Sequence, residues 1–406
     1  MRNLLLLAAS YWIYAWIDGR FLGLLLASTL VTYCIGLHLP RTRFPKLLLA
    51  IGLAASLGVL AYFKYTGFFL AIPLGLSFYT FQAMGYLIDV RRGNMPSEKN
   101  LLNFALFMAF FPKIVAGPIE RASHFLPQLR ERRSITFTRV REGTYLIVWG
   151  LLKKFVIADG AAVIANAGFQ HPTDPAQNLW IAALAFTLQI YADFSGYSDI
   201  AKGAASLLGF DLVWNFHLPY LSSSPQEFWK RWHISLSEWL RDYVYIPLGG
   251  SRRGAARTVV NTLCTMALVG LWHGGTWTYV LWGTYQGALI VAYRTKRVPC
   301  ARLFSVPFFF LLTVLGWILF RSETLADFWV FLSNLGRFGG SSAVASDLLV
   351  LWLPIIAMEW YQARKKDLLA MASAPAYLQT TFYIAAAVIF LLLLPSVHLP
   401  YLYETF

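Results

Sequence analysis

The chain has 406 residues, of which 58% are hydrophobic, 17% aromatic and only 13% charged. A soluble domain of this size carries about twice that share of charged residues, so the composition excludes a soluble globular protein and indicates an integral membrane protein. The formal net charge is +14. Because the basic residues cluster in loops between apolar runs, we interpret this charge as positive-inside bias and contact with anionic membrane lipid, not as a nucleic-acid surface.

Helices of about 20 residues cross a bilayer, so roughly ten spans or partial spans fit in the chain. We therefore predict an all-α polytopic membrane protein, with residues 1–406 forming a single membrane domain. Helices are expected over 4–16 and 21–37, as a hairpin around the polar residues 18–20, and over 47–63. The first apolar run lacks a small-residue cleavage site, which favours a first helix over a cleaved signal peptide.

The following part of the chain is less regular. Residues 70–87 are apolar but broken by Pro73 and Gly75, which suits a helix inside the protein and not one facing lipid. Residues 101–118 are expected to form a helix too short to span, followed by a re-entrant turn. The basic stretch 121–141 has interleaved apolar residues and is expected to lie on the cytoplasmic surface.

One later segment, 210–248, resembles a membrane span least. It is rich in tryptophan and charge, and we expect short helices there at the membrane interface or folded into the bundle. The remaining spans are predicted over 143–166, 179–208, 259–272, 277–292, 304–320, 348–361 and 377–394.

His273 lies in the apolar stretch 268–283, with no charged residue within eight positions on either side. An ionisable group in such a stretch is a candidate functional residue. Apolar surroundings push an imidazole toward its neutral form, which can accept a proton from an alcohol as a general base. The alternative is a structural histidine that bonds a backbone carbonyl between helices, and the pattern alone leaves both open.

A second histidine, His233, lies in the tryptophan-rich segment. Taken alone, it favours an interfacial histidine stacked among tryptophans. Glu238 follows at the fifth position, about 140° around a helix, so the two side chains are expected to diverge and not to form a histidine–acid pair. Asp199 is expected to be buried and to pair with Lys202 at i,i+3.

The loop 249–254 is rich in glycine but lacks the G-K-[ST] ending of a P-loop. Its backbone amides, with Arg252 and Arg253, could still hold a phosphate; a cytoplasmic turn is the alternative that we favour. The three cysteines are scattered without metal-ligand spacing, so neither a disulfide framework nor a metal site is predicted.

Several of these segments together resemble the membrane-bound O-acyltransferase family. Within the family, the chain is most similar to the alginate O-acetylation branch, which also acetylates peptidoglycan and other exopolysaccharides. The resemblance covers nearly the whole chain, and its first residues resemble the second helix of family members. The segments that carry it are 78–82, 86–89, 111–119, 193–201, 232–243, 245–250 and 272–275.

The resemblance implies a ring of transmembrane and re-entrant helices around a central tunnel. Residues 1–66 would be peripheral, about 70–295 the core, and 300–406 C-terminal helices with an aromatic tail. It implies that an acetyl group from a cytoplasmic donor, acetyl-CoA, crosses the inner membrane of a bacterium without a bound cofactor. An extracytoplasmic partner with a serine-esterase-like SGNH fold then transfers the acetyl to a polysaccharide such as alginate or peptidoglycan.

The resemblance also implies residue roles. His273 would be the catalytic histidine and His233 an accessory catalytic one, while Tyr403 matches the tyrosine of the family's C-terminal aromatic motif and would carry the acyl group. Glu404 stands where relatives have an aromatic residue. The residues assigned to substrate binding are Trp232, Arg231, Arg252, Arg253 and Asp199.

Other functions remain open at this point. Within the same enzyme class, the alternative is D-alanyl transfer in teichoic acid synthesis. In other classes, the alternatives are a non-catalytic acyl-carrier transporter and a scaffold for the extracytoplasmic partner. A transporter of this kind is expected to show paired broken helices in two related halves. The sequence has broken helices but no internal symmetry, so we favour the enzyme.

Overall fold

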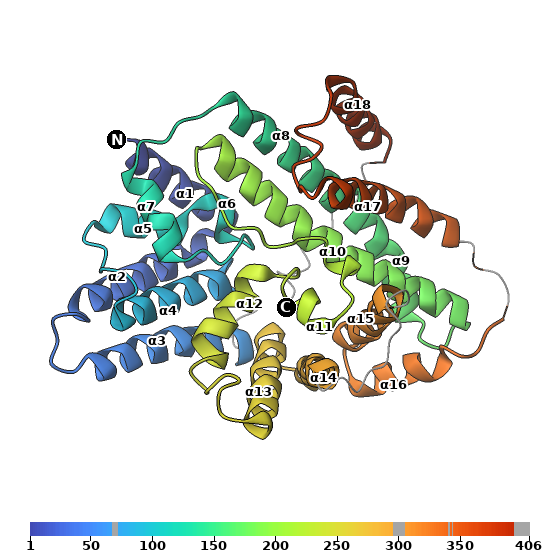
Figure 1. Cartoon of the computed structure of the whole chain (residues 1–406), viewed down its shortest axis with the longest axis horizontal. Helices are drawn as coiled ribbons and strands as arrows, with labels where there is room; N and C mark the ends of the chain where they lie inside the picture. The colour runs from blue at the N-terminus through green and yellow to red at the C-terminus, as the bar shows by residue number, and fades with distance from the viewer. Residues whose placement is uncertain (67–71, 295–304, 340–341, 343, 394–406) are drawn as a thin grey trace. The chain divides into compact units, whose positions relative to one another are not determined.

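The computed structural model describes residues 1–66, 72–294, 305–339, 342 and 344–393. These residues form helices and no strands, which confirms the predicted all-α class (Figure 1). They fall into two compact units. The first comprises Met1–Gly143 and Ala201–Trp214, and the second comprises Thr144–Ile200 and Asn215–Phe406.

The first unit holds the N-terminal helices. They are α1 (Arg2–Asp18), η1 (Gly19–Phe21), α2 (Leu22–His38), α3 (Pro45–Tyr65), α4 (Leu76–Arg92), α5 (Leu101–Ala109), α6 (Phe111–Ile114) and α7 (Ala122–Arg130). Two long helices, α8 (Phe137–Leu151) and α10 (Ala176–Leu207), contribute residues to both units.

The second unit holds the remaining helices. They are the π-helical turn η2 (Leu152–Ala158), α9 (Asp159–Gln170), η3 (Pro219–Leu221), α11 (Pro225–Phe228), α12 (Ile234–Leu240), the π-helical turn η4 (Arg241–Tyr245), α13 (Ala255–His273), α14 (Trp277–Arg294), α15 (Ser305–Arg321), α16 (Leu325–Asn334), α17 (Ala345–Lys365) and α18 (Ala376–Leu393).

Four helical segments are long and apolar enough to cross a membrane by themselves: Arg2–His38, Pro45–Tyr65, Ala176–Leu207 and Ala255–His273. Shorter apolar helices include Ser305–Arg321. The predicted segment 210–248 is confirmed as a series of short helices and turns. The chain is therefore a multi-pass membrane protein in which full spans alternate with shorter helices.

The predicted break near residue 18 is present, because Asp18 leaves helical geometry at φ −147° and ψ 65°. The predicted hairpin is wrong, however. The helix resumes after the single turn η1, so α1 packs mainly on α5 and α2 on α4 and α5, and the two helices diverge from the bend. A polar residue and a glycine are enough to kink a helix here but not to reverse it.

Glycines set the closest helix contacts of the second unit. A Cβ at Gly150 would lie 2.5 Å from the Gly196 carbonyl oxygen, so α8 and α10 touch backbone to backbone. A Cβ at Gly270 would lie 2.1 Å from the Tyr279 carbonyl oxygen, and one at Gly283 would lie 2.1 Å from that of Met266. Because only glycine permits such approach, α13 and α14 form a tight antiparallel pair with His273 at its turn.

Candidate active site

His273 is the last residue of α13, directly before the turn into α14. Its side chain is buried in the second unit, with 5% of the residue exposed. The imidazole lies among three aromatic rings, with ring centroids 4.6 Å from Trp272, 5.3 Å from Trp282 and 5.1 Å from Phe320. The predicted apolar surroundings are confirmed by these three rings.

His233 is also buried, and its backbone is unusual. It precedes α12 with φ +43°, a left-handed conformation that is rare outside glycine and asparagine. Its Nδ1 lies 3.2 Å from Oδ1 of Asn215, which also accepts a hydrogen bond from Oγ of Ser235 at 2.9 Å. Asn215 in turn donates from Nδ2 to Oγ of Ser198 at 3.3 Å. These bonds fix the orientation of the His233 ring.

The same bonds determine the tautomer of His233. Because Oδ1 of Asn215 can only accept, Nδ1 of His233 carries the proton and Nε2 is the basic nitrogen. Burial lowers the pKa of His233 to about 3, so its imidazole is neutral at physiological pH. His233 lies outside the four long apolar spans.

The structure brings the two histidines to one place. The indole of Trp272 packs against both, with ring centroids 4.6 Å from His273 and 6.1 Å from His233. Phe194, on α10, also packs edge to face with His233, with ring centroids 4.6 Å apart. An imidazole in such an aromatic setting can act as a general base toward a hydroxyl.

Trp232 belongs to the same aromatic cluster. It is buried and stacks on Phe228, with centroids 5.4 Å apart and planes at 15°. It also lies 5.1 Å from Trp317, which stacks at 5.5 Å on Trp282 beside His273. A continuous row of rings therefore connects Trp232 to His273. The assignment of Trp232 to substrate binding stays a prediction.

The charged candidates have other partners. Arg231 is held by Glu227, at 2.7 Å, and donates to the Leu218 carbonyl oxygen at 3.4 Å. Arg252 and Arg253 lie in the exposed turn before α13. Nineteen helical residues separate that turn from His273, about 28 Å at 1.5 Å per residue, so the structure does not bring these arginines to the histidines.

The predicted pair between Asp199 and Lys202 is wrong. Asp199 lies 2.6 Å from Nζ of Lys153 on the neighbouring helix, while Lys202 lies 2.8 Å from Asp211. The contact at Gly150 and Gly196 brings the two helices so close that a cross-helix partner is available to Asp199. The role of Asp199 in substrate binding stays a prediction.

Sequence reasoning missed two sets of residues. One is Asn215, the anchor of His233. The other is a buried ionic cluster beside Asp199, in which Lys153 also donates to Oγ of Ser195 at 2.9 Å and Lys154 bonds both Asp159, at 3.0 Å, and Asp193, at 2.8 Å. Two adjacent lysines inside an apolar stretch were the available signal, because charges in spans are paired and functional more often than not.

Other predicted features have simpler outcomes. Tyr403 lies outside the described residues, so its role stays a prediction. Within the described ranges, no group of three or more His, Cys, Asp or Glu side chains is placed to hold a metal ion. Cys34 and Cys264 are exposed and unbridged.

Comparison with known proteins identifies the class. Residues 94–298 match the model of MBOAT, the membrane-bound O-acyltransferase family. The chain is 41% identical over 366 residues to the probable alginate O-acetylase AlgI of Azotobacter vinelandii, covering 83% of this chain and 73% of the relative. It is 32% identical over 376 residues to the peptidoglycan O-acetyltransferase of Helicobacter pylori, covering 80% and 71%.

A more distant match is the teichoic acid D-alanyltransferase of Streptococcus thermophilus, at 31% identity over 238 residues and 54% of this chain. The fold, the buried histidines and these matches together define a polytopic helical acyltransferase. The chain belongs to the membrane-bound O-acyltransferase family. Its predicted place in the O-acetyltransferase branch is confirmed, whereas the single-domain description and the core over about 70–295 stay predictions.

Proposed function

We propose that the protein takes an acetyl group from acetyl-CoA on the cytoplasmic side of a bacterial inner membrane and passes it across for O-acetylation of an extracytoplasmic polysaccharide. The observation that carries this proposal is the pair of buried histidines on either side of Trp272. The alginate and peptidoglycan O-acetylating relatives support the acetyl group and the polysaccharide as donor group and final acceptor.

In the proposed reaction, His273 removes the proton from an acceptor hydroxyl, and the oxygen attacks the thioester carbonyl. The carbon–sulfur bond breaks, the coenzyme A thiolate leaves, and the imidazolium returns the proton to that thiolate. The hydroxyl that we propose is the phenol of Tyr403, whose pKa near 10 requires a base at neutral pH. A partner with an SGNH-type serine-esterase fold would then accept the acetyl group from the tyrosine ester.

This chemistry gives a direct test. After incubation of the purified protein with acetyl-CoA, the intact mass of the wild type is expected to rise by one acetyl group. His273→Ala and Tyr403→Phe are each expected to show no adduct, because loss of the base costs about 10² to 10⁴-fold in rate and loss of the phenol removes the acceptor.

Two results would contradict the proposal in different ways. An acetyl adduct on His273→Ala at wild-type rate would remove His273 as the base. No adduct on any variant, with no transfer of radiolabelled acetyl in native membranes, would remove acetyl transfer altogether. Retained acetylation of polysaccharide by Tyr403→Phe would leave the enzyme intact and reduce the C-terminal tail to an anchor.

A further inference from the structure

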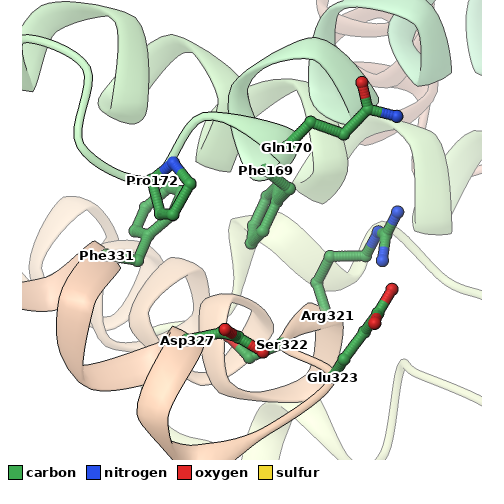
Figure 2. Close-up of a pocket in the computed structure, with 8 residues that line it drawn as sticks. All are labelled: Phe169, Gln170, Pro172, Arg321, Ser322, Glu323, Asp327 and Phe331. Carbon is green, nitrogen blue, oxygen red and sulfur yellow. The ribbon is translucent and has the colours of Figure 1, made fainter.

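A cavity of about 340 Å³ opens where α9 ends and α15 leads into α16, within the second unit (Figure 2). This volume falls at the lower end of the range for small-ligand pockets. None of its walls contributes to the histidine cluster directly. Its lining residues are Phe169, Gln170, Pro172, Arg321, Ser322, Glu323, Asp327 and Phe331.

One wall of the cavity is aromatic and carries a cation. Phe169 stacks on Phe331, with centroids 4.7 Å apart and planes at 20°. The guanidinium of Arg321 lies 5.6 Å from the centre of the Phe169 ring and donates one hydrogen bond, at 3.0 Å, to Oδ1 of Asn166. An arginine has five N–H donors, so most of the donors of Arg321 are available to a ligand.

The rest of the lining supplies acceptors and an amide. Figure 2 shows the side chains of Gln170, Arg321 and Glu323 on the same side of Phe169. Gln170, Glu323 and Asp327 are exposed. In Asp327, Oδ2 caps α16 by accepting from the backbone N–H of Thr324 at 3.0 Å, and it also accepts from Oγ1 of Thr324 at 2.7 Å. Within the described part of the chain, no ion pair joins Arg321 to either carboxylate. Glu323 lies close enough to interact with Arg321 electrostatically, and both side chains can still bond a ligand.

The location of the cavity connects it to the candidate active site. Arg321 directly follows Phe320, whose ring packs 5.1 Å from His273. His273 ends α13, which begins beside the basic segment 252–257, and Arg321 of the cavity ends α15, which follows the basic segment 294–302 in the sequence. Because basic loops face the cytoplasm, this end of the unit is the extracytoplasmic one, where an acceptor polysaccharide would be found.

We propose that this cavity binds an uncharged, hydroxyl-rich sugar unit of the acceptor polysaccharide; this rests on the proposed function. The edges of the stacked Phe169 and Phe331 rings, together with Pro172, give an apolar wall against which the carbon–hydrogen face of a pyranose can pack. Arg321 and Gln170 supply donors, while Glu323 and the second oxygen of Asp327 accept from sugar hydroxyls. Two carboxylates for one guanidinium repel a polyanion, so the charge balance favours a neutral sugar over a uronate.

The test measures sugar binding to the full-length protein in nanodiscs by saturation-transfer NMR. The probes are short gluco-, manno-, xylo- and N-acetylglucosamine oligosaccharides, with an oligouronate for comparison. At least one neutral oligosaccharide is expected to bind. We expect the affinity for this oligosaccharide to fall about tenfold in each of three variants, Gln170→Ala, Glu323→Ala and Arg321→Gln, because each loses one hydrogen bond in the binding pocket. Asp174→Asn, at the same end of the unit but outside the lining, is the matched control and is expected to bind normally.

Several outcomes would overturn this assignment. These are binding of none of the neutral oligosaccharides, binding of the oligouronate alone, and binding that all three variants leave unchanged. Variants that keep sugar binding but lose copurification with an extracytoplasmic protein would make the cavity a protein-docking site instead.

The proposed function is measured separately on the same samples. His273→Ala is expected to bind the sugar as the wild type does while failing to take up acetyl from acetyl-CoA. Sugar binding by a wild-type protein that takes up no acetyl would remove the proposed function and leave the cavity assignment. Acetyl uptake by a wild-type protein that binds no sugar would remove the cavity assignment and leave the proposed function.

Discussion

At the scale of single residues, removal of the Asn215 side chain tests whether the orientation of the His233 ring matters for acetyl transfer. Its Oδ1 holds both Nδ1 of His233 and Oγ of Ser235. Asn215→Ala frees the His233 ring to rotate, and a misplacement of about 1 Å costs about a hundredfold in rate. We expect the rate of acetyl transfer to fall by about that factor while KM for acetyl-CoA is unchanged. Ser237→Ala removes a hydroxyl of α12 that, within the described part of the chain, bonds the Trp232 carbonyl oxygen. This variant is expected to keep full activity, and equal losses in the two variants would refute the positioning role.

The buried neutral His233 also predicts a pH dependence of stability. Its pKa is lowered by burial to about 3 in the folded protein, against about 6.5 when unfolded. The unfolded chain therefore binds more protons below pH 6.5, so stability is full above that pH and falls as the pH drops toward 3. By pH 5 the loss is about 2 kcal/mol.

We expect the fall in Tm between pH 7.5 and pH 5, measured in detergent, to be smaller in His233→Gln than in the wild type. The opposite sign applies to His124, because its hydrogen bond with Glu120 raises its pKa; that contribution is present at low pH and is lost as the pH rises. An identical pH response in His233→Gln and the wild type would show that His233 is not buried in its neutral form.

At the scale of elements, the contact between α8 and α10 depends on two glycines. Cβ atoms at Gly150 and Gly196 would each lie within 3 Å of the carbonyl oxygen of the other residue. Gly150→Ala and Gly196→Ala must push the helices apart, which strains the packing by about 1–3 kcal/mol and lengthens the ion pair between Lys153 and Asp199. We expect a lower Tm and a lower rate of acetyl transfer for both variants. Gly58→Ala, in a helix with nothing within 4 Å of the new methyl group, is expected to leave both unchanged. A wild-type Tm in Gly150→Ala would show that the helices do not meet here.

The same elements explain what the sequence could and could not predict. Hydrophobic runs locate buried helices, so α10, α13 and the short helices after Trp214 follow from composition and periodicity. The candidate His273 follows from an ionisable group in such a run. The sequence does not predict which residue of another helix a side chain will contact, because periodicity reports which face of a helix is buried and not which residues pack against that face. Asn215 and His233 are 18 positions apart, and turns with the short helices η3 and α11 lie between them. The left-handed conformation of His233 has no signal in the sequence.

At the scale of the whole chain, the helix order of the second unit predicts which loops face each side of the membrane. The turn that contains Ser251 is rich in arginine, whereas the loop 171–175 carries no basic residue other than a histidine. By the positive-inside rule, the first faces the cytoplasm and the second faces outward. With the three native cysteines replaced by serine, Thr173→Cys is expected to react with a membrane-impermeant maleimide in intact cells. Ser251→Cys is expected to react only after the membrane is permeabilised.

This topology is required by both proposals, because a cytoplasmic donor must reach His273 from one side and an acceptor sugar must reach the cavity beside Arg321 from the other. Both Thr173 and Ser251 are exposed, so a difference in labelling reports the side of the membrane and not burial. Labelling in the reverse pattern would place the cavity in the cytoplasm, where no exported polysaccharide is present. The sugar-binding role would then be lost even if acetyl transfer to Tyr403 were intact. Equal labelling at both positions in intact cells would mean that the two loops do not lie on opposite sides of the membrane.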